Sequence, residues 1–358
     1  MVGKKFKIVS VNLLILAVGL ALLEIIFGGW TNPNRLNTLH VPTDVTLTYN
    51  VGGLYETDRQ QITYRRDQYG LRGNYGAPDA IDIMTVGGST TDQRYVSEGD
   101  TWQDVLRRDF LTRGRAVNIA NAGVDGQTSY GHIKNFDWWF PRIPNLKVKY
   151  FLFYVGLNDL YVNDRYEPDD LYDRPSSTFA YLKQQVRRRS VFYNLGITLT
   201  GMYRAYGDGL THRKVDYQKL EWQDAPEVKN HEELMETRLQ SYSERLRALE
   251  YRVRGLGAHS IYVTQTTGRC RESNGKVIAV AETATFDGVK VNGVDKCIMR
   301  RLINRRTMEF CRQAGGVCLD LAGEIKFGDG DFYDFPHTTP RGSEKIGHYL
   351  YTMLQGLF

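Results

Sequence analysis

From residue 81 onward the chain alternates short apolar runs with longer stretches of helical spacing, and this pattern restricts the possible folds more than any other feature. The apolar runs are nearly continuous, which is typical of strands buried on both faces of a parallel sheet. Helices between such strands build β–α–β units. We therefore expect an α/β domain. Its expected strands are Ile81–Val86, Val117–Ala120, Lys149–Val155, Ser260–Thr264 and Val317–Leu321.

Helical spacing lies between and after these runs, and the remaining segments divide the chain. We expect an anchor at 1–30, a linker with short strands at 31–80, and one domain at 81–358 with an insertion at about 160–230. Within 31–80 the short strands are Val45–Tyr49 and Gln61–Tyr64. The expected helices are Thr101–Leu111, Ser129–Phe140, His231–Arg254, Met299–Gln313 and Glu344–Leu357.

The N-terminal segment differs in composition from the rest. Three lysines, at positions 4, 5 and 7, precede an apolar run from Ile8 to about Phe27. A bilayer core needs roughly 20 apolar residues, and this run meets that length. Lysines at its start favour a cytoplasmic N-terminus. We therefore expect a single-pass anchor, with the main domain in the periplasm or outside the cell.

Two other interpretations of this run are open. A cleaved signal peptide has similar flanks, but Phe27-Gly28-Gly29-Trp30 follows the run in place of a small-x-small cleavage site. A buried helix of a soluble protein would show a polar face at helical spacing, and none is evident. Trp30 suits the membrane interface.

Cysteine usage agrees with export. The chain has four cysteines, at positions 270, 297, 311 and 318. An even number in an exported domain permits two disulfides in three possible pairings. We expect nearest neighbours to pair, Cys270 with Cys297 and Cys311 with Cys318. Between the first two, Val277–Val280 and Val289–Val291 suggest a hairpin.

Charge and motifs exclude several classes of function. The 46 basic residues are nearly balanced by 41 acidic ones, for a net charge of +5, so a dedicated nucleic-acid partner is not expected. The sequence contains no Walker loop, Gly-x-Gly-x-x-Gly or His-Glu-x-x-His motif. Without a C-x-x-C spacing, a zinc site is not expected either. We therefore expect no cofactor and no metal.

Small or polar residues follow the expected strands where an active site would form. Ligands of open α/β sheets bind at the carboxyl ends of the strands, so these segments should converge on one edge. They are Gly87-Gly88-Ser89-Thr90-Thr91, Asn121-Ala122-Gly123, Gly156-Leu157-Asn158-Asp159 and Asp334-Phe335-Pro336-His337.

These residue types match the needs of acyl transfer, which are a nucleophile, a base, a group that orients the base, and donors for the oxyanion. Ser89 lies at a glycine-rich turn that can expose its hydroxyl. His337 is the candidate base, and Asp334, three residues earlier, can fix its tautomer. The candidate oxyanion donors are the backbone N–H groups of Ser89 and Gly123 and the side-chain amide of Asn158.

The same residues resemble the four blocks of the SGNH (GDSL-type) hydrolase superfamily, in family order and over about residues 81–358. The first block is Gly-Gly-Ser-Thr here, as in membrane-anchored bacterial members, in place of the usual Gly-Asp-Ser-Leu. The resemblance implies a flavodoxin-like three-layer α/β/α sandwich with five parallel strands. It also implies Ser89 as nucleophile, His337 as base, Asp334 as its orienting group, and Gly123 and Asn158 in the oxyanion hole, without a cofactor.

We therefore expect a membrane-anchored serine esterase. Its substrate would be an acylated carbohydrate of the cell envelope or of an exported polysaccharide, or another small ester. An O-acetyltransferase with the same triad, and a non-catalytic assembly or binding protein of an envelope-polymer system, are the alternatives. The insertion at 160–230 contains Arg187-Arg188-Arg189, which suggests a solvated face or contact with anionic lipid headgroups.

Overall fold

The computed structural model describes residues 2–30, 39, 41–162, 177–207, 212–273 and 276–358. These residues form two compact units. One comprises Leu39–Tyr166 and Leu210–Phe358, and the other comprises Met1–Thr38 and Glu167–Gly209. The first unit contains every strand in the described part of the chain, and the second contains three helices.

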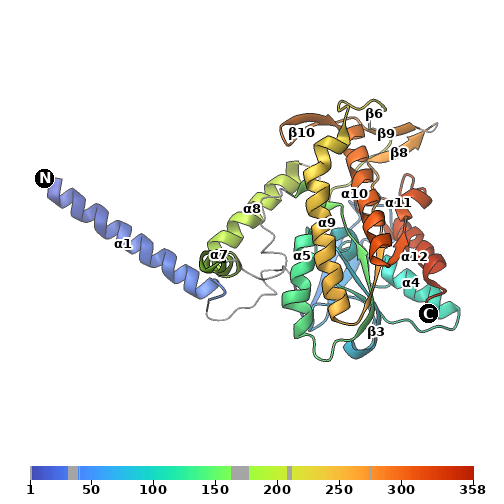
Figure 1. Cartoon of the computed structure of the whole chain (residues 1–358), viewed down its shortest axis with the longest axis horizontal. Coiled ribbons are helices and arrows are strands. Elements are labelled where there is room, and N and C mark those ends of the chain that lie inside the picture. Colours follow the sequence, from blue (N-terminus) through green and yellow to red (C-terminus); the bar gives the residue numbers. More distant parts are fainter. Residues whose placement is uncertain (1, 31–38, 40, 163–176, 208–211, 274–275) are drawn as a thin grey trace. The chain divides into compact units, whose positions relative to one another are not determined.

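A five-stranded parallel sheet lies at the centre of the larger unit, as the apolar runs predict (Figure 1). The strand order is β12-β7-β5-β3-β4, and each neighbouring pair is parallel. Every residue of β3 is buried, which explains its continuous apolar pattern. The strands are β3 (Ile81–Gly87), β4 (Ile119–Asn121), β5 (Val148–Tyr154), β7 (His259–Val263) and β12 (Val317–Leu319).

One face of the sheet is covered by α4 (Trp102–Thr112) and α12 (Pro340–Leu354). Alternate residues of β5, Leu152 and Tyr154, point to this side and join a core with Trp102. Helix α12 begins four residues earlier than expected, because Thr339 caps it and Pro340 occupies its first turn.

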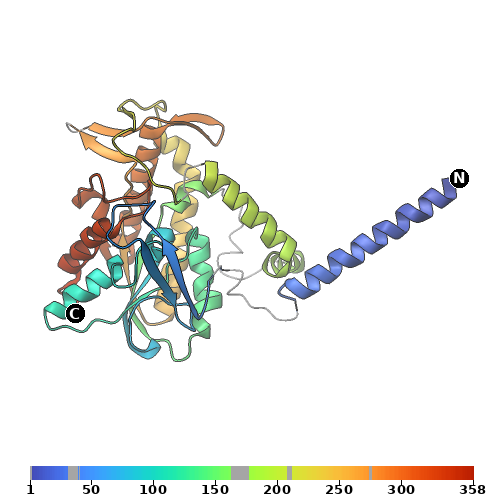
Figure 2. The same ribbon diagram turned by 180° about the vertical axis from the view of Figure 1, so that it is seen from behind.

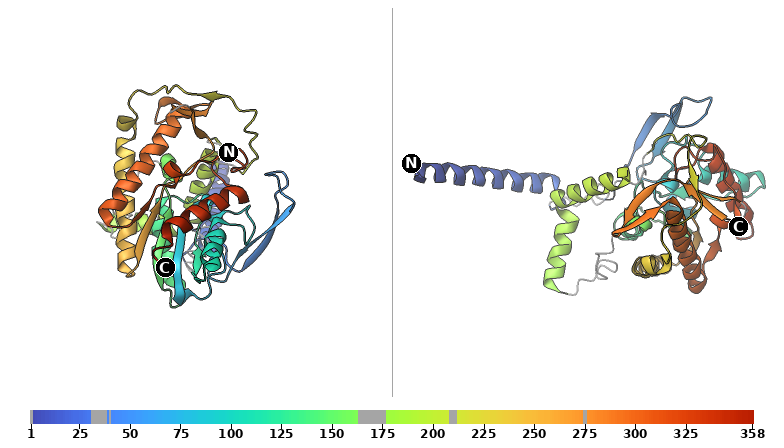
Figure 3. Two further views of the ribbon diagram at one scale, coloured as in Figure 1. Left: turned by 90° about the vertical axis from the view of Figure 1, so that its right-hand side faces the viewer. Right: turned by 90° about the horizontal axis from the view of Figure 1, so that it is seen from above.

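The other face is covered by aromatic side chains and by α9 (His231–Gly255) and α10 (Gly293–Ala314), which lie side by side (Figure 3). Phe153 of β5 stacks on Tyr262 of β7, and Tyr262 contacts Phe310 of α10. Helix α10 begins six residues before the expected start, at a capping box of Asn292 and Asp295.

The single helix expected over Ser129–Phe140 is divided in the structure. It comprises α5 (Ser129–Lys134), a π-helical turn η2 (Asn135–Trp139) and a 3-10 turn η3 (Phe140–Arg142). Four nearly consecutive aromatic residues, at positions 136, 138, 139 and 140, are all buried. A regular α-helix would turn some of them to solvent, and Pro141 cannot continue the hydrogen-bond pattern.

The segment expected to be a linker with short strands is largely a folded part of the larger unit. Strands β1 (Val45–Asn50) and β2 (Gln61–Arg66) form an antiparallel hairpin, drawn in blue in Figure 2. One face of the hairpin is buried in a small apolar cluster with Tyr333, a residue of the distant C-terminal region. The hairpin therefore packs beside the segment that contains Asp334 and His337.

The expected hairpin between Val277–Val280 and Val289–Val291 is wrong, because each segment pairs with a different neighbour. The first belongs to a sheet of order β6-β9-β8, and the second to a separate pair of strands. The pairing expected for the disulfides is confirmed, Cys270 with Cys297 and Cys311 with Cys318. The strands are β6 (Trp222–Gln223), β8 (Cys270–Ser273), β9 (Lys276–Val280), β10 (Thr283–Phe286) and β11 (Val289–Asn292).

The smaller unit contains α1 (Val2–Phe27), α7 (Thr178–Arg189) and α8 (Val191–Gly207). Its span Lys7–Phe27 is exposed, and it is long and apolar enough to cross a membrane, a property that signal sequences share. The remaining short elements, all in the larger unit, are η1 (Pro78–Ala80), α3 (Ser89–Asp92), η4 (Asn158–Tyr161) and α11 (Leu321–Glu324).

Candidate active site

Ser89 lies at the carboxyl end of β3, in the middle of the sheet, as the first residue of the short helix α3. Gly88 precedes it, and a Cβ atom there would lie 2.7 Å from Asn158 Nδ2 and 3.1 Å from the carbonyl oxygen of Gln127. Only glycine therefore lets these two groups approach the serine turn so closely.

Asp334 and His337 meet Ser89 through a continuous chain of hydrogen bonds. Nε2 of His337 lies 2.7 Å from Oγ of Ser89, and Nδ1 lies 2.7 Å from Oδ2 of Asp334. The backbone N–H of His337 also donates to Oδ1 of Asp334, at 2.8 Å. All three residues are buried, so little water competes for these bonds.

The segment 334–337 is fixed by bonds to its backbone. The hydroxyl of Tyr217 donates to the carbonyl oxygen of Asp334, at 2.7 Å. The carbonyl oxygen of Phe335 accepts from Gly268 N–H and from the Thr267 hydroxyl, each at 2.8 Å. These residues follow β7, so the adjacent strand end holds the histidine segment in register with Ser89.

The arrangement has the geometry of a serine nucleophile with its general base and an orienting carboxylate. Asp334 accepts from Nδ1 and so leaves Nε2 of a neutral His337 free to accept the serine proton. One nitrogen of His337, one carboxylate oxygen of Asp334 and one nitrogen of His212 lie within 4.8 Å of one another, a grouping that a metal ion could also use. Both nitrogens of His337 are already engaged by Asp334 and Ser89, so the hydrogen bonds account for this grouping.

Asn158 lies beside Ser89 with its side chain held in a defined orientation. Its amide donates one hydrogen to the carbonyl oxygen of Gln127, at 2.8 Å. The side chain of Gln127 is itself held by Asn135, whose amide donates to its Oε1 at 2.9 Å. An amide has two N–H donors, so Asn158 retains one for a substrate oxygen.

Asp159, the next residue, anchors this loop. Its carboxylate accepts from the hydroxyl of Ser129 in α5, and Arg245 of α9 lies 3.4 Å from it. Both charged groups are almost fully buried. The Asn-Asp pair of the Gly-Leu-Asn-Asp segment thus has two different roles, since Asn158 faces the serine turn and Asp159 faces the helices.

Gly123 lies next to the site, but its backbone groups are already engaged. Its N–H donates to Oδ1 of Asn121, at 2.8 Å, and its carbonyl oxygen accepts from the Arg66 guanidinium. The N–H that we expect to serve as an oxyanion donor is therefore engaged in this structure, and the role of Gly123 stays a prediction. Spacing along the sequence places this glycine near the serine, but it does not reveal that the N–H is occupied.

His212 is a residue at the site that sequence reasoning missed. Its ring stacks on the ring of His337, with centroids 4.2 Å apart, and its Nδ1 lies 2.8 Å from the hydroxyl of Tyr333. Its Nε2 faces Asp125, at 3.6 Å. Burial alone would raise the pKa of Asp125, but hydrogen bonding to His212 and the charges of His212 and Arg94 hold it well below its ordinary value.

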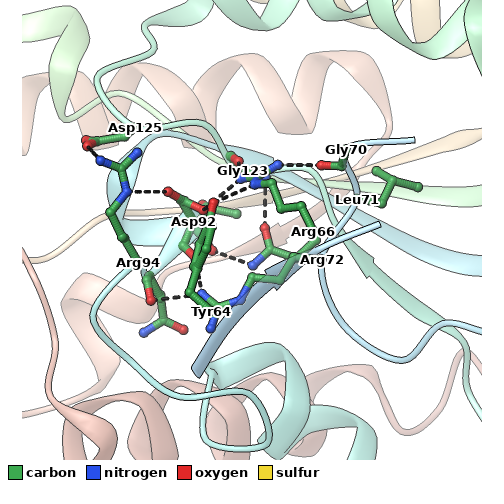
Figure 4. A network of polar contacts seen from close by, with 12 residues as sticks. Tyr64, Arg66, Gly70, Leu71, Arg72, Asp92, Arg94, Gly123 and Asp125 are labelled. Carbon is green, nitrogen blue, oxygen red and sulfur yellow. Dashed lines mark hydrogen bonds and ion pairs between the residues drawn. The ribbon is translucent and has the colours of Figure 1, made fainter. Parts of the chain in front are cut away.

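A buried network connects the serine turn to the β1–β2 hairpin (Figure 4). Arg66 of β2 pairs with Asp92 of α3 at 2.7 Å, and both side chains are almost completely buried. The hydroxyl of Tyr64 donates to the same carboxylate, at 2.9 Å. Burial and the nearby charge of Asp92 raise the pKa of Tyr64 to about 12, so it stays protonated as a donor.

Two more arginines extend this network on either side. Arg72 donates to the carbonyl oxygens of Asp92 and Gln93, at 2.5 and 2.8 Å. Arg94 lies 3.8 Å from Asp92 and 3.3 Å from Asp125. A series of charged side chains therefore connects Asp92, in the helix that begins at Ser89, through Arg94 and Asp125 to His212, which contacts His337. The sequence alone did not indicate that Arg66, Arg72 and Arg94 contact residues near the serine turn.

Known proteins were compared with the chain. Solved structures that resemble it include an α/β-hydrolase enzyme from the metagenome of Lake Arreo, with 14% identity, a TM-score of 0.43, and coverage of 80% of this chain and 100% of the other. An acetyl xylan esterase from Geobacillus stearothermophilus has 10% identity, a TM-score of 0.42, and coverage of 78% and 96%. No curated protein matches significantly.

The family comparison covers most of the larger unit. The model of the GDSL-like lipase/acylhydrolase family matches residues 83–350, which include most of β3, the serine turn after it and the segment that contains Asp334 and His337. The chain therefore belongs to the GDSL-like lipase/acylhydrolase family of ester-hydrolysing serine hydrolases.

Proposed function

We propose that this protein is a membrane-anchored esterase that uses Ser89, His337 and Asp334 as its catalytic triad. The observation that carries the proposal is the unbroken series of hydrogen bonds from Asp334 through His337 to Ser89 Oγ. Ser89 and His337, which are 248 positions apart in sequence, meet at one edge of the sheet in the geometry that acyl transfer requires.

The reaction has two steps. In the first, Ser89 Oγ attacks the ester carbonyl while His337 Nε2 takes the hydroxyl proton, and Asp334 stabilises the resulting imidazolium. His337 then returns the proton to the leaving alcohol, and an acyl-enzyme remains on Ser89. In the second, water attacks the acyl-enzyme with His337 again as base, which releases the acid and restores the serine.

The oxyanion needs donors that are not already occupied. The N–H of Ser89 is the first of α3 and has no intrahelical acceptor, and Asn158 retains one amide hydrogen. In the turn after β4, the N–H groups of Gly123, Val124 and Gln127 are all engaged.

We extend the proposal to location and substrate. The span Lys7–Phe27 would act as a single-pass anchor with a cytoplasmic N-terminus, since Lys4 and Lys5 precede it and Lys7 begins it. The catalytic unit would then lie in the periplasm or outside the cell, where its two disulfides are stable. Acylated polysaccharides of the envelope, or polysaccharides in export, are ester substrates of that compartment.

The decisive experiment measures hydrolysis of p-nitrophenyl acetate by the full chain in detergent. We expect Ser89→Ala and His337→Ala to lower kcat by about 10³-fold or more, because either change removes the nucleophile–base pair. Ser97→Ala is a matched control, since Ser97 is as buried as Ser89 and lies outside the triad. A fluorophosphonate probe should label the native protein on Ser89.

Two results would decide against parts of the proposal. Equal kcat for the native protein and Ser89→Ala would remove Ser89 from the mechanism. Transfer of acetyl to an added sugar, without release of acetate, would make the protein an O-acetyltransferase with the same triad.

A further inference from the structure

Helices α7 and α8 carry an unusual distribution of charge. Between Thr178 and Gly207 the sequence has no acidic residue and five basic ones. The basic residues are Lys183, Arg187, Arg188, Arg189 and Arg204. The chain as a whole balances 46 basic against 41 acidic residues, so this segment concentrates positive charge that the rest of the protein does not share.

Helix α7 presents a row of apolar side chains to solvent. Phe179, Leu182 and Val186 are all exposed, Phe179 at 76% and Leu182 at 56%. Their spacing of three and four residues places them on one stripe of the helix. Lys183 and Arg189 come next to this stripe on its two sides, by the same periodicity. Apolar rows with basic residues at their margins are typical of helices that lie in the membrane interface.

Helix α8 also has a row of exposed apolar side chains. Phe192, Leu195, Leu199 and Tyr203 are exposed and follow the same spacing. The part from Val191 to Thr200 is apolar as a whole. Two successive helices therefore leave apolar stripes uncovered in the described structure, which is costly for a surface that faces only water.

The end of α7 contacts the residues that directly follow α1. The backbone N–H of Gly29, two residues after the end of α1, donates to the carbonyl oxygen of Arg189 at 2.8 Å. The Arg189 guanidinium lies over the ring of Trp30, at 5.9 Å from its centroid. The indole N–H of Trp30 donates to Glu24, the one acidic residue of the apolar run, at 2.9 Å. The end of α7 is thus joined to the point where α1 would leave the bilayer.

We propose that α7 and α8 lie on the surface of an anionic bilayer, with their apolar stripes in the headgroup region and with Lys183, Arg187 and Arg189 of α7 against lipid phosphates. The inference rests on the proposed anchor, and it adds a second membrane contact that the anchor does not require. The apolar stripes supply the buried area, and the excess of positive charge selects anionic lipid.

The test uses the full chain in bilayer nanodiscs and a bimane label on single introduced cysteines. All four native cysteines are in disulfides, so the introduced thiol is the one labelled. The label goes on Leu182→Cys in the stripe, on Tyr181→Cys as a control on another face of α7, and on Phe27→Cys at the end of α1. Nitroxide-bearing lipids quench a label only when it is in or near the bilayer.

We expect strong quenching at position 27, quenching at position 182 at least about twofold stronger than at 181, and a further increase when a third of the lipid is phosphatidylglycerol. Lys183→Glu with Arg187→Glu should remove that increase. Quenching at 27 without quenching at 182 would overturn this inference and leave the anchor intact. Absence of quenching at 27 would overturn the anchor itself, and equal quenching in neutral and anionic discs would overturn the choice of lipid.

Discussion

At the scale of single residues, the environment of His132 makes the stability of the fold depend on pH. His132 is completely buried in α5, and burial lowers its pKa to about 4 from an ordinary 6.5, against a smaller opposing effect of Asp159. Between these values the unfolded chain binds a proton that the folded chain does not bind. Stability therefore falls as the pH falls through this window.

The pKa shift of His132 predicts the size of this loss. About 2.5 pH units at 1.36 kcal/mol each correspond to about 3 kcal/mol of unfolding free energy between pH 6.5 and 4. Urea denaturation of the full chain in detergent, followed by tryptophan fluorescence, measures it. His132→Gln should show a shallower fall over the same window. Parallel curves for the two proteins would contradict this origin.

His212 should act as a positioning residue for the base. Its ring packs on His337 at 4.2 Å while Tyr333 and Asp125 hold its two nitrogens. We expect His212→Ala to lower kcat about tenfold with a smaller change in KM. The substitution removes the ring that packs against the imidazole of His337 and helps to fix its orientation. His212→Phe keeps an aromatic ring there and should restore most of the rate. If both variants lose the same activity, stacking is not the cause.

At the scale of secondary-structure elements, the β1–β2 hairpin braces the serine turn. Arg66 neutralises Asp92, and its guanidinium also bonds to the Gly123 carbonyl. Arg66→Met should cost about 3–5 kcal/mol of stability, because it leaves a buried carboxylate without its partner. The folded fraction should also have a lower kcat. Thermal unfolding and steady-state kinetics measure the two effects.

Arg65 provides the control for this prediction, since it lies one residue away on the exposed face of the same strand. Arg65→Met should change stability by less than about 0.5 kcal/mol. Arg66→Lys should recover only part of the loss, because an ammonium group cannot reproduce the planar set of donors. Equal stability of Arg66→Met and Arg65→Met would show that the network is not a brace.

Secondary-structure elements could be predicted where the sequence has a single clear hydrophobic pattern. Continuous apolar runs identified the five strands of the sheet, and the small or polar residues after β3 and β5 marked the edge where Ser89 and Asn158 meet. The partner strands of Val277–Val280 and Val289–Val291 were not predictable, since alternating residues do not specify which strand is the partner. The sequence also could not identify Arg66 and His212 as site residues, because their contacts are with segments far away in sequence.

At the scale of the whole molecule, anchoring and catalysis are separable. Every residue assigned to the triad and to the oxyanion donors lies in the unit of Leu39–Tyr166 and Leu210–Phe358. The proposed anchor and the basic helices lie in the other unit. We therefore expect the proposed anchor to have no direct part in bond cleavage and to affect only which substrates the enzyme meets.

A protease site inserted between residues 31 and 38 tests this separation in the full chain. Cleavage there should leave kcat and KM for p-nitrophenyl acetate within about twofold, because the hydrogen bonds of the proposed triad all join residues that follow the cut. The native chain, which lacks the inserted site, is treated with the same protease as the control. A loss of turnover that follows the time course of cleavage would mean that α1 supports the geometry of the site. Unchanged turnover would assign α1 to location alone.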